Sequence, residues 1–185
     1  EGGSNMISGT IASCNSRADV IALLEELNKS KKEYKYIALD TIDNMADWAE
    51  YTVCEEEGVR AIADLPFGKG FGLVRQKVMN TIDVFSKLTK HLIIIGHRKV
   101  AYAVTDGSTL VIPESLDLTG KTKNLIMSKS DAIGYIYRGE EEDLRVSFNA
   151  NNAIEAGSRC EHLKGKDFPF EWNSIYKEKA DEMDS

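Results

Sequence analysis

Apolar residues follow two patterns along this chain, one typical of helices and one typical of buried strands. Helical spacing covers residues 16–28, 42–57 and 71–89, and the last stretch has a predicted buried stripe of Phe71, Val74, Val78, Ile82 and Phe85. Two nearly continuous apolar runs, residues 34–40 and 91–96, predict strands covered on both faces of a parallel sheet. The order strand, helix, strand makes them parallel neighbours.

The rest of the chain predicts shorter elements around this centre. Residues 10–14 suggest a short strand and residues 119–130 a helix. Alternating apolar positions in residues 132–138 and 144–148 predict an antiparallel hairpin with an acidic turn, and its second strand is expected at a sheet edge. Residues 149–157 are expected to be irregular, 168–172 to form an apolar strip, and 174–182 to form a charged helix.

Composition and length indicate one globular domain over residues 1–185. Three cysteines without metal-ligand spacing favour a reducing, cytoplasmic setting, and no apolar run approaches the roughly 20 residues that span a bilayer. The net charge of −7 argues against a generally basic nucleic-acid binder. Residues 58–139, however, carry 12 Lys and Arg against 6 Asp and Glu. This excess is either a local phosphate-attracting patch or an ordinary charged surface.

The first candidate site is the end of the 34–40 strand, where the apolar run stops at Asp40. Open α/β sheets bind ligands at the carboxyl ends of their strands, and an aspartate there suits a hydrated Mg²⁺ beside nucleotide phosphates. The alternative is an aspartate that only caps the next helix.

The second run ends in His97, Arg98 and Lys99. If the two strands are parallel neighbours, these residues reach the same edge as Asp40. A histidine there can contact a phosphate or a catalytic water, although a lone histidine at a strand end is more often a structural hydrogen-bonding residue.

Residues 64–72 contain three glycines within five positions around Lys69. We expect a mobile loop that contacts DNA or substrate, with an ordinary flexible connector as the alternative. Phe67 and Phe71 flank the glycines, as a base-stacking platform requires, or they belong to the core.

Together, Glu1-Gly2-Gly3, the strand ending at Asp40-Thr41, the Gly68-Lys69-Gly70 segment before a long helix, and Ile93-Ile94-Ile95-Gly96-His97 resemble the phage RecA-like ATP-binding proteins. This P-loop group of the AAA type includes single-strand annealing proteins related to the RadA-type recombinases. The resemblance implies a three-layer α/β RecA-like core, mainly parallel with an antiparallel edge hairpin, that assembles into homo-oligomers.

The resemblance also implies roles for individual residues. Glu1 stands where a glutamate orients the attacking water, and Asp40 with Thr41 stands at the Walker B position that holds Mg²⁺ through water. His97 matches the polar sensor that ends the next strand. Residues 98–123 match a mobile second DNA loop. Arg159 would approach a nucleotide, either of its own subunit or of a neighbouring one, unless it forms only a surface salt bridge. The implied contacts to single-stranded DNA are Gly68, Lys69, Gly70, Arg98, Lys99, Lys121 and Lys123.

One departure from the family pattern is large, because no Gly-x-x-x-x-Gly-Lys-Ser/Thr sequence occurs in these 185 residues. We expect the P-loop strand to lie upstream of Glu1, although Glu1 to Ser4 also fits a linker joined to a native start at Met6. The expected function is ATP- and Mg²⁺-dependent binding, annealing or recombination of single-stranded DNA by the intact protein. The alternative is a non-catalytic RecA-like binding module without a P-loop.

Overall fold

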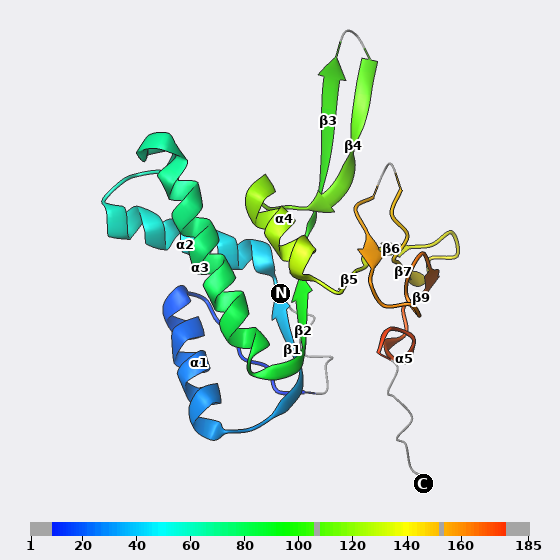
Figure 1. The fold of residues 1–185 in the computed structure, drawn as a ribbon, viewed down its shortest axis with the longest axis horizontal. Helices are drawn as coiled ribbons and strands as arrows, with labels where there is room; N and C mark the ends of the chain where they lie inside the picture. The colour runs from blue at the N-terminus through cyan, green and yellow to red at the C-terminus, as the bar shows by residue number, and fades with distance from the viewer. Residues whose placement is uncertain (1–8, 106–107, 152–153, 177–185) are drawn as a thin grey trace. The chain divides into compact units, whose positions relative to one another are not determined.

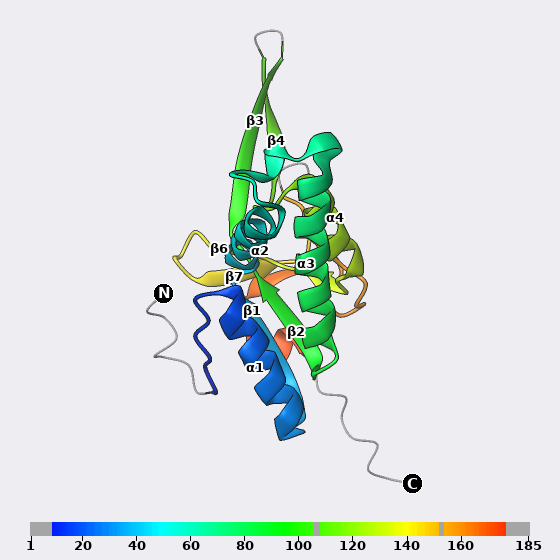
Figure 2. The same ribbon diagram turned by 90° about the vertical axis from the view of Figure 1, so that its left-hand side faces the viewer.

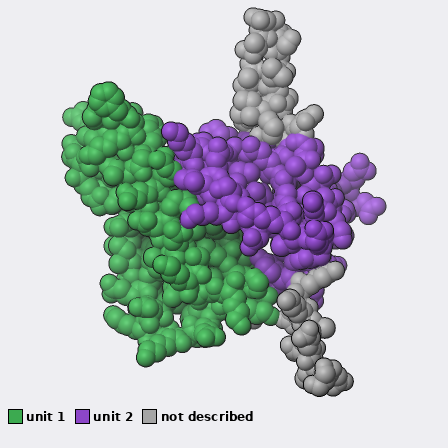
Figure 3. All heavy atoms as spheres, in the orientation of Figure 1, with its two compact units in different colours: residues 1–97 green, residues 98–185 purple. Residues whose placement is uncertain are grey.

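The structure, a computed structural model, describes residues 9–105, 108–151 and 154–176. Where the sequence predicted a single core, the chain divides into two compact units, residues 1–97 and 98–185, coloured separately in Figure 3. No helix of the described residues is long and apolar enough to cross a membrane.

The first unit contains helices around a small parallel sheet (Figure 1). Its elements are α1 (Arg17–Ser30), β1 (Tyr34–Asp40), α2 (Ile42–Glu57), the 3₁₀ turns η2 (Ile62–Asp64) and η3 (Pro66–Gly68), α3 (Lys69–Ser86) and β2 (Thr89–Ile95). These helices and strands confirm the predicted order. The strand predicted at residues 10–14 is wrong, because no described segment pairs with those residues and they form no regular structure.

Helix ends in this unit follow from local chemistry. The side chain of Ser16 caps α1 by accepting a hydrogen bond from the backbone N–H of Asp19. Gly58 ends α2 in the left-handed conformation, with φ of 66°, where a side chain would be strained. The start of α1 and the end of α2 agree with the predicted ranges 16–28 and 42–57.

Strands β1 and β2 pair in parallel, from Tyr34 opposite Thr89 to Asp40 opposite Ile95, which confirms the predicted crossover. The prediction that both strands are covered on both faces is wrong, since no residue of either strand is fully buried. Ile95 is 42% exposed. The physical reason is that each strand has only one neighbour in the described chain, so the sheet is too narrow to be enclosed.

The core of this unit lies between α2 and α3, which cross and pack against each other (Figures 1 and 2). Ile42 and Val53 of α2 are completely buried, and the predicted stripe on α3 is confirmed for Val74, Val78, Ile82 and Phe85. Phe71 was wrongly assigned to that stripe. It lies in the first turn of α3 and is 43% exposed.

The glycine-rich segment 64–72 is not the predicted loop. Helix α3 already begins at Lys69, so Gly70 and Gly72 lie in its first turns. Gly70 is buried against η2, and a Cβ atom at this position would be 2.4 Å from the carbonyl oxygen of Ile62. The glycine therefore permits close packing of helix and turn, and the sequence signal was misread as mobility.

The second unit begins with an antiparallel hairpin of β3 (Arg98–Thr105) and β4 (Ser108–Leu116). Helix α4 (Gly120–Lys129) follows and confirms the helix predicted there. The segment 98–123, expected to be a mobile second DNA loop, consists largely of two paired strands and the first turn of a helix. Antiparallel main-chain pairing between β3 and β4 stabilises this segment, and its mixed composition did not predict that pairing.

The remaining strands are short: β5 (Ala132–Ile133), β6 (Tyr135–Arg138), β7 (Leu144–Ser147), β8 (Gly157–Ser158) and β9 (Asp167–Pro169), followed by α5 (Trp172–Ile175). The predicted hairpin of β6 and β7 is confirmed. Its second strand is not at an edge, however, because β9 pairs with the other side of β7. Most of the range predicted as a helix, 174–182, lies outside the described residues. Within them, α5 ends at Ile175.

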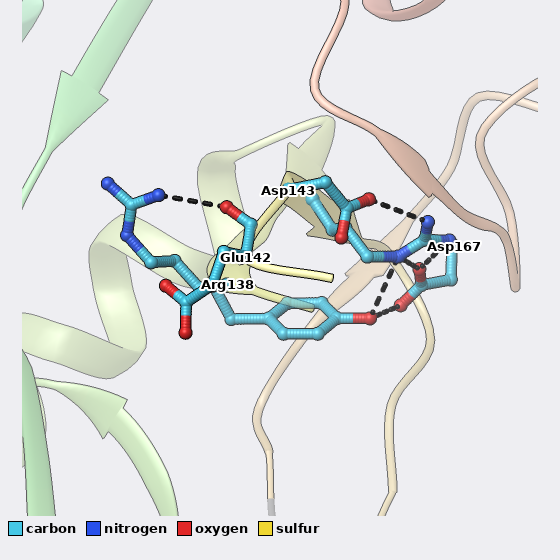
Figure 4. Close-up of polar contacts among 6 residues, drawn as sticks. Arg138, Glu142, Asp143 and Asp167 are labelled. Atoms are coloured by element: carbon cyan, nitrogen blue, oxygen red, sulfur yellow. Dashed lines mark hydrogen bonds and ion pairs between the residues drawn. The ribbon is translucent and has the colours of Figure 1, made fainter. Parts of the chain in front are cut away.

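Two interactions hold this three-stranded sheet. On one face, Val146, Phe148 and Leu163 form a buried cluster, with Phe168 and Phe170 packed against it. On the other, the Arg145 guanidinium donates to Asp143 at 3.2 Å and to Asp167 at 2.8 Å, and the hydroxyl of Tyr137 donates to Asp167 at 2.8 Å (Figure 4). This polar clasp links residues of all three strands or their turn.

Candidate functional site

The candidate site is the carboxyl edge of the two-stranded sheet in the first unit. Asp40 ends β1 with an exposed side chain. Its peptide bond to Thr41 is cis, and α2 starts at the next residue. Only Thr41 separates β1 from α2, so Asp40, Thr41 and Asp43 all lie at one end of β1.

His97 reaches this edge from the neighbouring strand. Its backbone N–H donates to Oδ1 of Asp43 at 3.2 Å, and its Nδ1 lies 2.8 Å from Oδ2 of the same carboxylate. With the carboxylate ionised, only the imidazole can supply the proton of the second contact. One aspartate therefore holds both the backbone and the ring of His97, and so ties the segment after β2 to the first turn of α2.

The sequence predicted that Asp40 and His97 reach the same edge of the sheet. The ends of β1 and β2 lie side by side, as predicted, and both Asp40 and His97 follow from those ends. The residue that contacts His97 is nevertheless Asp43. The sequence signal was present, because an acid in the first turn of a helix after a strand is well placed to receive donors, but such acids are also common where they only complement the helix dipole.

The pKa of Asp43 reflects this contact. Partial burial would raise the pKa of Asp43, but the hydrogen bonds from the ring and backbone of His97 outweigh that effect and hold the pKa below its ordinary value. The hydroxyl of Thr41 also lies near this carboxylate, although not in a geometry that makes a hydrogen bond.

We expect Asp43→Asn to lower stability at pH 7 and this difference from wild type to shrink as the solution is acidified. A carboxyl group whose pKa is depressed by folding stabilises the fold above its unfolded pKa, about 3.9, and loses that contribution as the pH falls through the folded pKa. Urea unfolding at pH 7 and at pH 3 measures the difference. Asp47→Asn, the same charge change on the same helix, serves as control. A difference between Asp43→Asn and wild type that stays constant with pH contradicts the role given to the His97 contact.

Thr41 gives a test of whether a ligand fits at this edge. Its side chain is buried, with 9% of the residue exposed, and its Oγ1 atom has no hydrogen-bond partner in the described structure. A buried hydroxyl without a partner costs free energy, and a bound water or phosphate oxygen would remove that cost. The exposed carboxylate of Asp40 beside it is the oxygen ligand that Mg²⁺ prefers.

No group of three or more His, Cys, Asp or Glu side chains that could hold a metal occurs among the residues described. Mg²⁺ commonly binds through one or two carboxylates, with water and phosphate oxygens completing its shell. Asp40 therefore fits such an ion only together with a bound nucleotide. Glu1, expected to orient the attacking water, lies outside the described residues.

The predicted DNA-contacting cations mostly have acidic partners within their own units. Lys69 lies 2.6 Å from Glu57 in the first unit. In the second, Lys99 lies 3.1 Å from Asp117, and Lys123 lies 2.7 Å from Glu155. These pairs join positions that are 12, 18 and 32 residues apart in the chain, so the charge pattern alone did not reveal them.

Two predicted arginines are also engaged. Arg98 is paired with Glu114 and donates to the hydroxyl of Tyr135 at 3.0 Å. Arg159 donates to the backbone oxygen of Ser128 at 2.6 Å and lies 3.8 Å from Asp131. The alternative for Arg159, a surface salt bridge, is therefore present. Lys121 is exposed in the first turn of α4.

Comparison with known proteins gives one result. A family model described as an AAA domain matches residues 1–160, which is most of the chain. No match was found among curated proteins or solved structures. This chain therefore belongs to the AAA domain family, a family of nucleotide-binding, ATPase-like proteins.

Proposed function

We propose that this chain forms part of the nucleotide-responsive core of an ATP-dependent protein that binds single-stranded DNA and anneals or recombines it. The observation that carries the proposal is the tie between Asp43 and His97 beside Asp40, at the carboxyl edge of two parallel strands. Ligands of open α/β sheets bind at such edges, and family membership supports a nucleotide there.

Asp40 is the residue proposed to hold Mg²⁺ through water, and the hydroxyl of Thr41 is proposed to bind a water or phosphate oxygen of the same site. Bound Mg²⁺ neutralises charge on the phosphates of ATP. Asp43 keeps the His97 ring in one orientation, so that the ring can respond to the occupied site and pass the change to the segment that follows β2. Glu1 remains the proposed residue for positioning water.

The phosphates need a cradle that is not among these 185 residues, because the Gly-x-x-x-x-Gly-Lys-Ser/Thr pattern does not occur in them. We place that loop on a further strand beside β1. Support comes from β1 itself, which has one neighbour in the described chain and no fully buried side chain. A parallel sheet is normally covered on both faces and flanked by more strands than this.

The proposed DNA contacts require the ion pairs of Lys69, Arg98, Lys99 and Lys123 to open. Ion pairs at exposed side chains contribute little to stability, so phosphate groups can replace the carboxylates of Lys69, Arg98 and Lys99 at small cost. The Lys123 side chain is only 16% exposed, so its pair with Glu155 costs more to open. Arg159 likewise has to leave Ser128 to reach a nucleotide of a neighbouring subunit. If ATP binding favours these rearrangements, nucleotide binding and DNA binding are coupled.

The test is binding of a non-hydrolysable, fluorescent ATP analogue by the full natural protein, with Mg²⁺ or EDTA and with or without oligo(dT). We expect Mg²⁺-dependent binding that single-stranded DNA tightens by about 5- to 150-fold, the usual range of coupling between sites. His97→Ala should reduce this coupling more than it reduces nucleotide binding itself. DNA binding without any nucleotide binding would refute the ATPase assignment and establish the non-catalytic module.

A further inference from the structure

The turn that precedes α3 holds an aromatic side chain entirely in solvent. Phe67 is fully exposed, and Phe71, in the first turn of α3, is 43% exposed. A phenylalanine with its whole side chain in solvent is unusual in a folded unit, whereas Phe71 is more than half covered. The ring of Phe67 is therefore accessible to a ligand.

The backbone fixes Phe67 in this position. Pro66 precedes it, and both Phe67 (φ 55°, ψ 25°) and Gly68 (φ 70°, ψ 18°) adopt the left-handed conformation, which is unfavourable for a residue with a side chain. The N–H of Lys69 closes the turn on the carbonyl of Pro66. Gly70 behind it packs against Ile62. Such unfavourable conformations persist where the surrounding contacts impose them, and they cluster at ligand-binding positions.

Two arginines near the turn are not part of the ion pairs that the described residues form. Of the acids at the end of α2, Glu57 pairs with Lys69 and Glu56 pairs with Lys77 at 2.7 Å. The carboxylate of Asp64 accepts the backbone N–H of Ala61 at 3.1 Å. Within the described residues, neither Arg60, which precedes the turn, nor Arg75, one helical turn after Phe71, is paired with an acid.

We infer that Phe67, assisted by Phe71, is a stacking platform for bases of single-stranded DNA, and that Arg60 and Arg75 contact the phosphates beside it. This inference rests on the proposed function and adds the residues that bind bases. An exposed aromatic ring accepts any base on its face, and the planar guanidinium suits phosphate oxygens. The unstacked bases of a single strand have flat apolar faces, and these can pack against the exposed rings of Phe67 and Phe71.

A platform of this kind binds mainly through bases. Two arginine contacts give a slope of only about −1.4 for the logarithm of the binding constant against the logarithm of the salt concentration. Removal of the bases from the oligonucleotide should therefore weaken binding to this site more than moderate salt does.

The experiment compares oligo(dT) with an abasic oligonucleotide of equal length, using the full natural protein. We expect Phe67→Ala to weaken oligo(dT) binding by about 5- to 150-fold, the effect of losing one stacked base, and to leave the weak abasic binding unchanged. Phe67→Trp should retain affinity, and its fluorescence should be quenched by oligo(dT) but not by the abasic strand. Tyr51→Ala is the matched control, because Tyr51 is an aromatic residue that is 66% exposed on α2.

The outcomes separate this inference from the proposed function. If wild type binds oligo(dT) and Phe67→Ala binds it equally well, the platform is refuted while the DNA-binding function stands. If Phe67→Ala leaves DNA binding intact but changes the assembly state in light scattering, the ring contacts protein and the inference is also overturned. If wild type binds no single-stranded DNA at all, both proposals fail.

Discussion

Asp40→Asn is expected to lower Mg²⁺-dependent ATP turnover of the full natural protein by about 100-fold or more, because it removes the charge proposed to hold the metal beside the phosphates. The substitution keeps the size of the side chain, and Asp40 is exposed at the end of β1, so the fold should persist. Steady-state turnover at saturating Mg²⁺, with and without oligo(dT), measures the effect, and circular dichroism checks the fold.

The matched control for that experiment is Asp47→Asn, which removes the same charge from an exposed position on α2 away from the strand ends. It should turn over ATP at the wild-type rate. Normal turnover in Asp40→Asn would remove this residue from the site, and with it the Mg²⁺ position proposed at this edge.

The second prediction is that alanine substitutions at two glycines of α3 change the free energy of unfolding in opposite directions. Gly70→Ala should destabilise the protein by about 1–3 kcal/mol, because the new Cβ atom would be 2.4 Å from the backbone oxygen of Ile62 and helix and turn would have to separate. Gly72→Ala should instead stabilise it by about 0.5–1 kcal/mol, because alanine is the better helix former and the nearest atom to the new Cβ is in the Arg75 side chain, 3.9 Å away.

Urea unfolding midpoints of the two glycine variants give the comparison directly. Stabilisation by both substitutions would mean that the first turn of α3 does not pack on η2 in solution and that the segment is the loop expected from its composition. The pair thus tests the largest difference between the sequence-based prediction and the structure.

Local patterns predicted the elements of this chain well. Helical periodicity located α1, α2 and α3, and continuous apolar runs located β1 and β2 and their parallel pairing. The pattern could not show how well the strands are covered, because coverage depends on neighbours of the sheet. Glycines were also ambiguous, since the residue that permits a loop equally permits the close approach seen at Gly70.

The candidate site was predictable in its position but not in its contacts. Strand ends in a parallel crossover must share an edge, so Asp40 and His97 followed from the order of elements. The partner of His97 depended on where α2 begins relative to the segment after β2, and the two residues are 54 positions apart in the chain. The same applies to the cations, whose acidic partners became visible only with the fold.

The place of β9 in the second unit has a practical consequence for anyone who shortens this protein. The family match ends at residue 160, whereas β9 comprises Asp167–Pro169. A polypeptide that ends at the family boundary would lack β9, so the main-chain groups along one side of β7 would lose their hydrogen-bond partners. Arg145 would lose Asp167, and the cluster around Val146 would become exposed to water. Strand sides uncovered in this way recruit other chains, so such a fragment should aggregate, and expression trials should extend past Phe170.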